Sequence, residues 1–466
     1  MTIMKQKNTI GYVIFMAVVA AIGGILFGYD TAVISGTTEI VKGQFGLDAM
    51  AEGWYVGCAL IGSIAGVLVA GSLSDYLGRK LTMLISAALF SISAIGCAVC
   101  GSFDSLVVFR IIGGIGIGIV SIVSPIYISE VSPAKIRGTL VSLYQLAVTV
   151  GFLLAYLVNW IINSTGNLAV TGDLWTNIWN SEMWRGMLGS ETLPALLFFF
   201  VIFFIPESPK WLIVNGKVDK ASLVLQKIYN TQTEIDEEIT VTRNSLNGET
   251  KGKWSDLLKP GIIIAVIAGS AIAILGQFMG VNAVLYYGPK IFTEAGFDDP
   301  MFSTVLVGVV NMVTTILAVF IIDRVGRKQL IYWGVSGMII CLLAIGIYFA
   351  WGPQIGLGNG FMLTFFLAYV FCCAISISAI VFVLLSEMYP NSVRGRAMSI
   401  AGFALWIGTY LIGQLTPVLL GWSQAGTFFI FAACCIPYML IMWKVVPETT
   451  GKTLEEIEQY WENYKK

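Results

Sequence analysis

Long apolar stretches recur along the whole chain of 466 residues, and they constrain its fold more than any other feature. Each stretch is about 20 residues long, the length that an α-helix needs to cross the hydrocarbon core of a bilayer. Backbone groups inside a bilayer must bond to one another, so we expect helices. With charged residues taken as boundaries, the predicted spans are 10–36, 53–74, 81–101, 105–128, 138–162, 185–205, 260–288, 301–322, 329–350, 360–386, 397–420 and 425–444.

Composition supports a membrane protein over a soluble one. Apolar residues make up 57% of the chain and charged residues 12%, whereas soluble domains carry about 45–50% and about 25%. The 50 glycines and 13 tryptophans are typical of packed membrane helices with interfacial anchors. We therefore predict an all-α polytopic membrane protein. Its net charge of −1 provides no basic surface for nucleic acid.

Several kinds of chemistry are excluded by the residues present. The chain has no histidine, which removes histidine acid–base catalysis, histidine metal ligation and a Ser-His-Asp triad. All eight cysteines lie in apolar stretches, where they are expected to pack between helices. The glycines of GIGIG (114–118) open no βαβ unit, so close helix packing explains them better than nucleotide binding. We expect no enzyme activity, no metal and no cofactor.

The basic residues predict the orientation in the membrane. With both termini placed in the cytoplasm, all 27 basic residues lie in cytoplasmic segments except Lys42, Arg185 and Lys290 outside and Arg110 within a span. Positive charge is concentrated on the cytoplasmic side of membrane proteins. We therefore predict a multi-pass protein of the cell membrane with both termini inside.

Three motifs occur twice, in register. DYLGRK (75–80) recurs as DRVGRK (323–328), SEVSPAKIRG (129–138) as SEMYPNSVRG (386–395), and PES (206–208) as PET (447–449). The chain is therefore predicted to be a duplicated bundle with a substrate site between its halves and alternating access. The predicted parts are an N-terminal bundle (1–205), a linker with short amphipathic helices (206–258), a C-terminal bundle (259–446) and a tail (447–466).

Three ionisable residues fall within the predicted spans: Asp30, Arg110 and Glu191. Charge inside a membrane is costly, so such residues are functional candidates. Counted from the predicted outer helix ends, each lies about six residues down, or about 9 Å at 1.5 Å per residue. We expect one cluster at a common depth. It serves either as a proton switch, in which protonation of Asp30 releases Arg110, or as a static ion-pair cluster.

These motifs resemble the sugar porter family of the major facilitator superfamily. The paired GRK loops, the RGxxxS sequences, PESPKWL and PETTGKTLEE carry the resemblance over essentially the whole chain. GGILFGYDTAVISG (23–36), RIIGGIGIGIVS (110–121) and GVNAVLYYGP (280–289) are most similar to the bacterial xylose–proton symporters of that family. The resemblance implies a bacterial transporter that acts as a monomer in the lipid bilayer.

Asp30 bears on the mode of transport. Symporters of the family have Asp at this position, whereas the glucose facilitators have Asn in the matching FGYN. The resemblance therefore implies proton-coupled symport of a monosaccharide, with Asp30, Arg110 and Glu191 as the coupling residues and the proton as coupling ion. The alternatives are a passive uniporter and a polyol (inositol-type)–proton symporter. A sugar sensor would need a longer cytoplasmic tail.

Sugars are bound by amides, which both donate and accept hydrogen bonds, and by aromatic rings. The amides deep in the spans are Gln145, Gln277, Asn282, Asn311 and Gln414. Any one of them could be an interhelical hydrogen bond. The family resemblance implies sugar contacts at Gln145, Gln277, Asn282, Asn311 and Trp406, and it leaves Gln414 to packing. Gly276 stands where the family usually has glutamine and Phe382 where tryptophan is common, so the sugar can be a pentose or a hexose.

Span 260–288 contains helix-breaking residues near its outer end. Gly280 and Gly288 flank Tyr286 and Tyr287, and Pro289 follows. Such a helix can break, so that its outer part moves as a gate. An ordinary kinked helix with interfacial tyrosines is the alternative. The resemblance implies that Tyr286 and Tyr287 form the extracellular gate.

Charged residues at the inner helix ends form symmetric sets. The resemblance implies that they form salt bridges between the bundles, a cytoplasmic latch that holds the outward-open state. Positive-inside topology alone would explain the arginines but not the paired glutamates. The latch residues are Arg79, Glu130, Arg137, Glu207, Arg324, Glu387, Arg394 and Glu448.

Overall fold

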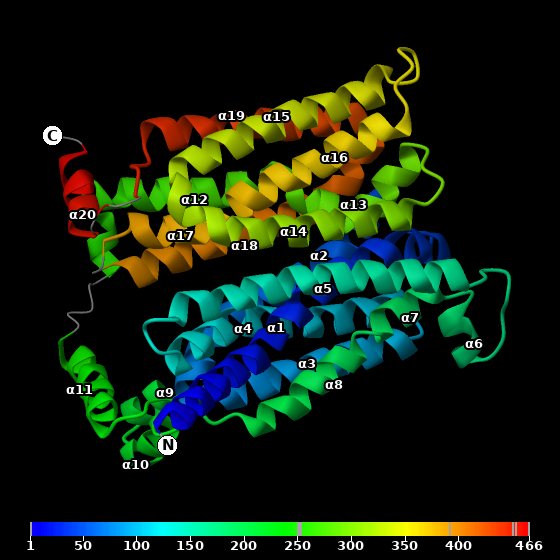
Figure 1. Cartoon of the computed structure of the whole chain (residues 1–466). Helices are drawn as coiled ribbons and strands as arrows, with labels where there is room; N and C mark the ends of the chain where they lie inside the picture. Colours follow the sequence, from blue (N-terminus) through cyan, green and yellow to red (C-terminus); the bar gives the residue numbers. More distant parts are fainter. Residues whose placement is uncertain (1, 249–253, 391–392, 450–451, 453, 465–466) are drawn as a thin grey trace. The chain divides into compact units, whose positions relative to one another are not determined.

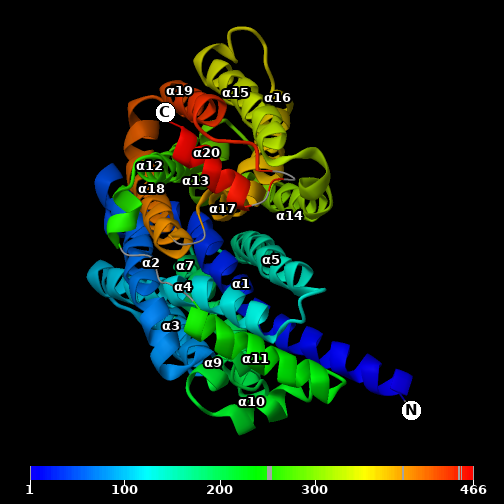
Figure 2. The same ribbon diagram turned by 90° about the vertical axis from the view of Figure 1, so that its left-hand side faces the viewer.

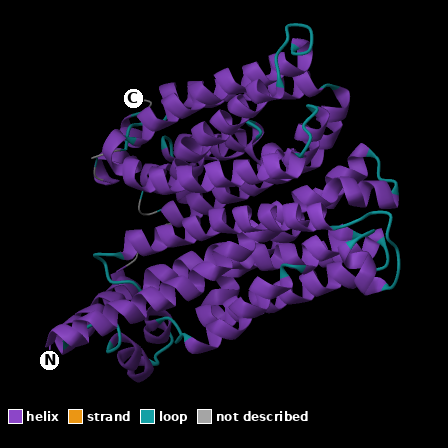
Figure 3. Ribbon diagram, turned by 45° about the vertical axis from the view of Figure 1, so that its right-hand side comes forward, coloured by secondary structure: helices purple, strands orange, loops and turns teal. Residues whose placement is uncertain are grey.

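The structure is a computed structural model that describes residues 2–248, 254–390, 393–449, 452 and 454–464. Helices account for almost all of this part of the chain, and no strand occurs in it (Figure 3). The predicted all-α fold is confirmed. Twelve helical segments among the described residues are long and apolar enough to cross a membrane, as the sequence predicted.

The spans follow the order of the chain (Figure 1). In the first half they are α1 (Thr2–Phe45), α2 (Ala49–Leu77), α3 (Arg79–Val99), α4 (Phe103–Val131), α5 (Arg137–Thr165), and α7 (Met183–Gly189) continued by α8 (Thr192–Val201) and η1 (Ile202–Phe204). In the second half they are α12 (Ile262–Phe278) continued by α13 (Val281–Glu294), α14 (Pro300–Val325), α15 (Arg327–Trp351), α16 (Asn359–Cys373) continued by the π-helix η3 (Ala374–Ser378) and α17 (Ala379–Met388), α18 (Arg394–Trp422) and α19 (Gln424–Lys444).

Short helices occupy the connections. The predicted linker helices are present as α9 (Pro209–Val214), α10 (Val218–Leu225) and α11 (Gln232–Gly248), which lie near the N-terminus (Figure 1), followed by η2 (Trp254–Leu258). The C-terminal helix α20 (Leu454–Asn463) packs against α12 and α17 (Figure 2), and Trp461 Nε1 donates to Met388 O. Two short helices, α6 (Leu174–Trp179) and α20, were not predicted.

The contacts divide the chain into two compact units. Unit 1 comprises residues 1–33 and 61–250, and unit 2 comprises residues 34–60 and 251–466. The end of α1 and the start of α2 thus pack with the second half of the chain. The predicted division at 205, 258 and 446 remains a prediction.

Glycines bring the helices of unit 1 into backbone contact. A Cβ on Gly28 of α1 would lie 1.9 Å from Val148 O of α5, and one on Gly151 would lie 2.2 Å from Ile25 O. A Cβ on Gly118 would lie 2.1 Å from Ser63 O of α2. No other residue type fits these positions without a backbone shift. The glycines of 114–118 therefore serve helix packing, as predicted.

Candidate functional site

An ion pair lies inside unit 1, between α1 and α4. Arg110 Nη1 donates to Asp30 Oδ1 across 2.7 Å, and both side chains are 3% exposed. Gly113, one turn after Arg110, allows α3 and α4 to approach, because a Cβ there would lie 2.5 Å from Ser93 Oγ. A buried ion pair does little for net stability, because desolvation offsets the Coulomb attraction. Its retention in this position therefore points to function.

Glu191 completes the cluster at a break between α7 and α8. Its side chain is buried, and it lies within hydrogen-bonding reach of the Asp30 carboxyl group. Asp30 Oδ2 and Glu191 Oε1 accept no hydrogen bond from a donor in the described residues. Beside them, Tyr29 Oη and Ser190 Oγ lie 2.6 Å apart. Two carboxylates facing one arginine repel each other, and a single proton shared between them would remove the repulsion and form a hydrogen bond.

The depth count that predicted this cluster was wrong for α1. The helix does not end near residue 36 but continues to Phe45, so Asp30 lies far from its end. Within this continuing helix, the hydroxyls of Thr37 and Thr38 donate to the carbonyls of Ile34 and Ser35. The expected grouping of Asp30, Arg110 and Glu191 is nevertheless present.

Two of the predicted sugar contacts lie together in unit 2. Asn282 Nδ2 donates to Gln277 Oε1 at 2.6 Å across the break between α12 and α13. Thr409 Oγ1 of α18 shares its single proton between Leu405 O at 2.9 Å and Gln277 Oε1 at 3.1 Å. Gly408 allows this approach, because a Cβ there would meet the Gln277 side chain at 3.1 Å. Thr409 does not stand out in the sequence, because threonine is common where helices pack together.

The other predicted sugar contacts lie on several helices. Gln145 is exposed on α5 of unit 1. In unit 2, Asn311 on α14 and Trp406 on α18 are half-buried, and Phe382 on α17 is 53% exposed. Gly276 is buried, and a Cβ there would make ordinary contacts with Ile377 and Tyr438. The part of the chain that is described shows no hydrogen bond between Asn311 and Gln277.

The predicted break in span 260–288 is present. Gly280 has φ +90°, a left-handed conformation that separates α12 from α13. A second kink lies at Tyr287, where φ is −120° and ψ is 18°. Both predicted gate tyrosines are buried, and Tyr287 Oη donates to Gly413 O of α18 at 2.7 Å.

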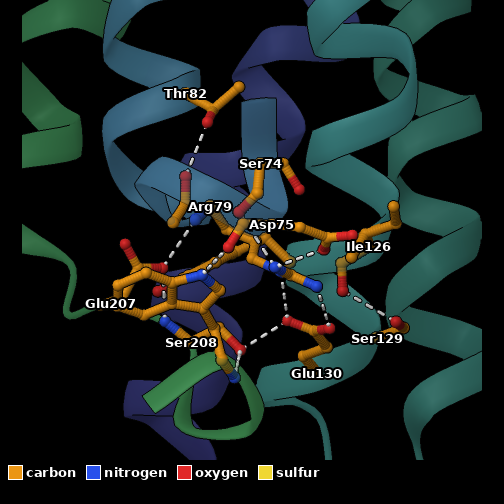
Figure 4. A network of polar contacts seen from close by, with 12 residues as sticks. Ser74, Asp75, Arg79, Thr82, Ile126, Ser129, Glu130, Glu207 and Ser208 are labelled. Atoms are coloured by element: carbon orange, nitrogen blue, oxygen red, sulfur yellow. Dashed lines mark hydrogen bonds and ion pairs between the residues drawn. The ribbon is translucent and has the colours of Figure 1, made fainter. Parts of the chain in front are cut away.

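Three latch residues of unit 1, Arg79, Glu130 and Glu207, lie in a polar network at the start of α3 (Figure 4). Arg79 pairs with Glu130 of α4, with Nε 3.0 Å from Oε2. Ser208 Oγ donates to the same Oε2 at 2.5 Å, and Glu207 accepts from the backbone N–H groups of Arg79 and Lys80. Burial raises the pKa of Glu207 above its ordinary value, against the opposing effect of these N–H donors.

The second copy of the motifs repeats this network in unit 2. Arg327 Nη2 lies 3.1 Å from Glu387 Oε1, Thr449 Oγ1 donates to Glu387 Oε2, and Lys328 N donates to Glu448. Arg327, not Arg324, is thus the counterpart of Arg79, as the alignment of DYLGRK with DRVGRK could have indicated. The side chain of Arg324 lies outside the described residues.

Two latch arginines bond to nearby carbonyls. Arg137 Nε donates to Ser132 O, and Arg394 Nε donates to Tyr389 O. Each arginine thus closes the turn before its own helix. These bonds of the latch residues connect residues within one unit, and the expected salt bridges between bundles remain a prediction.

A duplicated twelve-span helical protein with an acid–arginine cluster buried in its spans has the architecture of a secondary membrane transporter. The chain belongs to the sugar transporter family: it matches the family described as "Sugar (and other) transporter" over residues 16–461.

Individual relatives are similar over nearly their full length. The chain is 38% identical to the arabinose-proton symporter of Bacillus subtilis over 98% of this chain and 96% of that protein. It is 37% identical to the D-xylose-proton symporter of Escherichia coli over 98% of each. Among solved structures, an inward-open conformation of the xylose transporter from E. coli matches with a TM-score of 0.83 at 35% identity, over 97% of this chain and 100% of that one.

Proposed function

We propose that this protein is a proton-coupled symporter that carries a monosaccharide, a pentose or a hexose, into the cell by alternating access. It acts as a monomer with both termini in the cytoplasm. The observation that carries the proposal is the buried cluster of Asp30, Arg110 and Glu191. The names of the symporter relatives support the same function.

The cluster holds and releases one proton. Arg110 keeps its positive charge throughout, because a guanidinium is not deprotonated in proteins. Without the proton, the cluster carries one net negative charge inside the membrane. When Asp30 and Glu191 share a proton, the cluster is neutral, which lowers the cost of moving its helices relative to the bilayer.

Sugar binding is assigned to the amides and the gate. Gln277 and Asn282 lie at the break between α12 and α13, so a sugar bound there would contact the residues about which α13 can move. Gln145, Asn311, Trp406, Tyr286 and Phe382 supply the remaining contacts, and Gly276 leaves space for the sugar ring. One proton moving through 100 mV provides about 2.3 kcal/mol, enough for about 50-fold accumulation.

Sugar-driven proton uptake in lightly buffered proteoliposomes tests the proposal. A panel of pentoses, hexoses and polyols is added outside while the external pH is recorded. External alkalinisation with one sugar is expected, and Asp30→Asn should abolish it while counterflow of labelled sugar persists. Asp104→Asn, which changes an exposed acid near the start of α4, is the matched control. Counterflow without any proton movement would make the protein a uniporter, and alkalinisation with polyols alone would make it a polyol symporter.

A further inference from the structure

A second group of buried charges lies in unit 2, where the end of α1 and the start of α2 meet α13. Lys290 Nζ of α13 lies 2.5 Å from Glu52 Oε1 of α2, and Lys42 Nζ of α1 lies 2.9 Å from Glu52 Oε2. Glu39 Oε1 lies 3.3 Å from Lys290 Nζ. The Glu52 side chain is fully buried and that of Lys290 is 9% exposed. A buried carboxylate is tolerated only when its charge is paired, so each lysine contact holds its helix to α2.

The start of α2 is also fixed to α18. Gln414 Nε2 donates to Met50 O at 2.9 Å, and a Cβ on Gly53 would lie 2.0 Å from Gln414 O. The two helices therefore approach to backbone contact at this level. Glu52 is consequently presented to Lys290 from a rigid support rather than from a mobile loop.

Lys290, in contrast, belongs to the segment that carries the gate. It follows the Tyr287 kink by three residues, and α13 is separated from α12 by the left-handed Gly280. The same helix carries Asn282 and Tyr286, which the proposed function assigns to the sugar. A movement of α13 about Gly280 would displace Lys290 and break its contact with Glu52.

We propose that Glu52 and Lys290 are positioning residues for transport: they form an ionic clamp that holds α13 in its closed position on the side of the membrane opposite the N-terminus. This inference rests on the proposed function. The clamp lowers the population of the outward-open state, because the buried charges of Glu52 and Lys290 must separate to reach that state. External sugar then binds only the small open fraction, which raises the apparent KM by the inverse of that fraction.

Lys290→Gln is the test variant, since Glu52 retains Lys42 as a partner and the buried carboxylate stays paired. External KM for the transported sugar should fall about 3- to 10-fold, while the maximal rate falls because return from the open state is slowed. Lys290→Arg keeps the charge and should restore both values. Lys42→Gln, which removes the partly exposed partner of the same carboxylate but not the contact to α13, should change KM less than twofold.

Labelling of the variant Val56→Cys reports the gate without any sugar. Val56 lies on α2 one turn after Glu52, is 2% exposed, and like Tyr286 of α13 lies within 4 Å of a Cβ built on Gly413, so a membrane-impermeant thiol reagent should modify position 56 faster when Lys290→Gln is added than without it. Peptide mass spectrometry locates the modified site. Each variant should be monodisperse in detergent, which verifies that it is folded. The clamp is refuted if Lys290→Gln matches Lys290→Arg in labelling rate, or if Lys42→Gln accelerates labelling as strongly. Failure of the symport proposal would instead appear as sugar counterflow without proton movement in the wild type, and it would leave the labelling comparison intact.

Discussion

Arg110 pairs with one oxygen of Asp30 and leaves the other, Oδ2, without a hydrogen-bond donor in the described part of the chain, while Glu191 lies within hydrogen-bonding reach of the same carboxyl group. The cluster is therefore unevenly balanced: two acids face a single base. Removal of the Arg110 charge and removal of the Asp30 charge should consequently lower the stability of the protein by different amounts, which distinguishes this cluster from a simple ion pair.

Arg110→Gln should destabilise the protein more than Asp30→Asn does. The first change leaves two buried carboxylates without compensation, at a cost of about 3–5 kcal/mol. Asp30→Asn leaves Arg110 with Glu191 as its remaining partner, so the loss of stability is smaller. Thermal unfolding of the detergent-solubilised variants measures the difference.

The double variant Asp30→Asn/Arg110→Gln is the control for this prediction. It should unfold at a higher temperature than Arg110→Gln, because only one buried carboxylate remains, although proton coupling stays absent. Equal effects of the two single variants, or a double variant whose loss equals their sum, would contradict the shared cluster.

The sequence predicted the spans and the grouping of charges better than the helix ends. With charged residues as boundaries, the sequence predicts that α1 stops before Glu39 and Lys42. Both residues are helical in the structure, and each pairs with a residue distant in sequence, Glu39 with Lys290 and Lys42 with Glu52. A charge paired by tertiary structure is indistinguishable, in sequence alone, from one that faces water. For the same reason Glu52 and Lys290 were placed just outside the predicted spans.

The local backbone break at Gly280 was predicted from its glycine. The break between α7 and α8 at Ser190 and Glu191 was missed, although Gly189 precedes it and Pro194 follows it. The π-helix at 374–378 was missed likewise. Side-chain partners such as Thr409 with Gln277 depend on the relative rotation of two helices, which hydrophobic periodicity does not determine finely enough.

Gly280→Ala should lower both stability and transport. Alanine in the left-handed region costs about 1–2 kcal/mol, and a Cβ at this position would also lie 2.3 Å from the Phe431 ring. Gly296→Ala is the matched control, since its φ is +80° and nothing lies within 4 Å of the added Cβ. Melting temperatures should therefore fall further for Gly280→Ala. Phe431→Leu in the Gly280→Ala background should recover part of that loss, and equal losses at both glycines would rule out the steric contact.

Thr409→Val should weaken sugar binding by loosening the Gln277 amide. Loss of one hydrogen bond costs about 0.5–1.5 kcal/mol, which corresponds to an increase in KM of about 2- to 12-fold. Thr409→Ser keeps the hydroxyl and should behave as the wild type. Thr416→Val on the same helix removes a hydroxyl that bonds only to Ile412 O and should leave KM unchanged. A similar rise in KM for both valine variants would assign the effect to helix packing rather than to Gln277.

Glu207 and Glu234 should affect the pH dependence of stability in opposite directions. Burial raises the pKa of Glu207 above its ordinary value of 4.5, so the stability that it contributes is present below that value and is lost as the pH rises through the folded-state pKa. Hydrogen bonds from Thr231 lower the pKa of the exposed Glu234, so the stability that Glu234 contributes is present above the ordinary pKa value and is lost as the pH falls.

Melting curves between about pH 4 and about pH 7 for wild type, Glu207→Gln and Glu234→Gln measure the two contributions to stability. The melting temperature of the wild type relative to Glu207→Gln should fall with rising pH, and relative to Glu234→Gln it should rise. A difference between wild type and Glu207→Gln that rises with pH would mean that burial does not control the ionisation of Glu207, and a difference from Glu234→Gln that falls would contradict the prediction for Glu234.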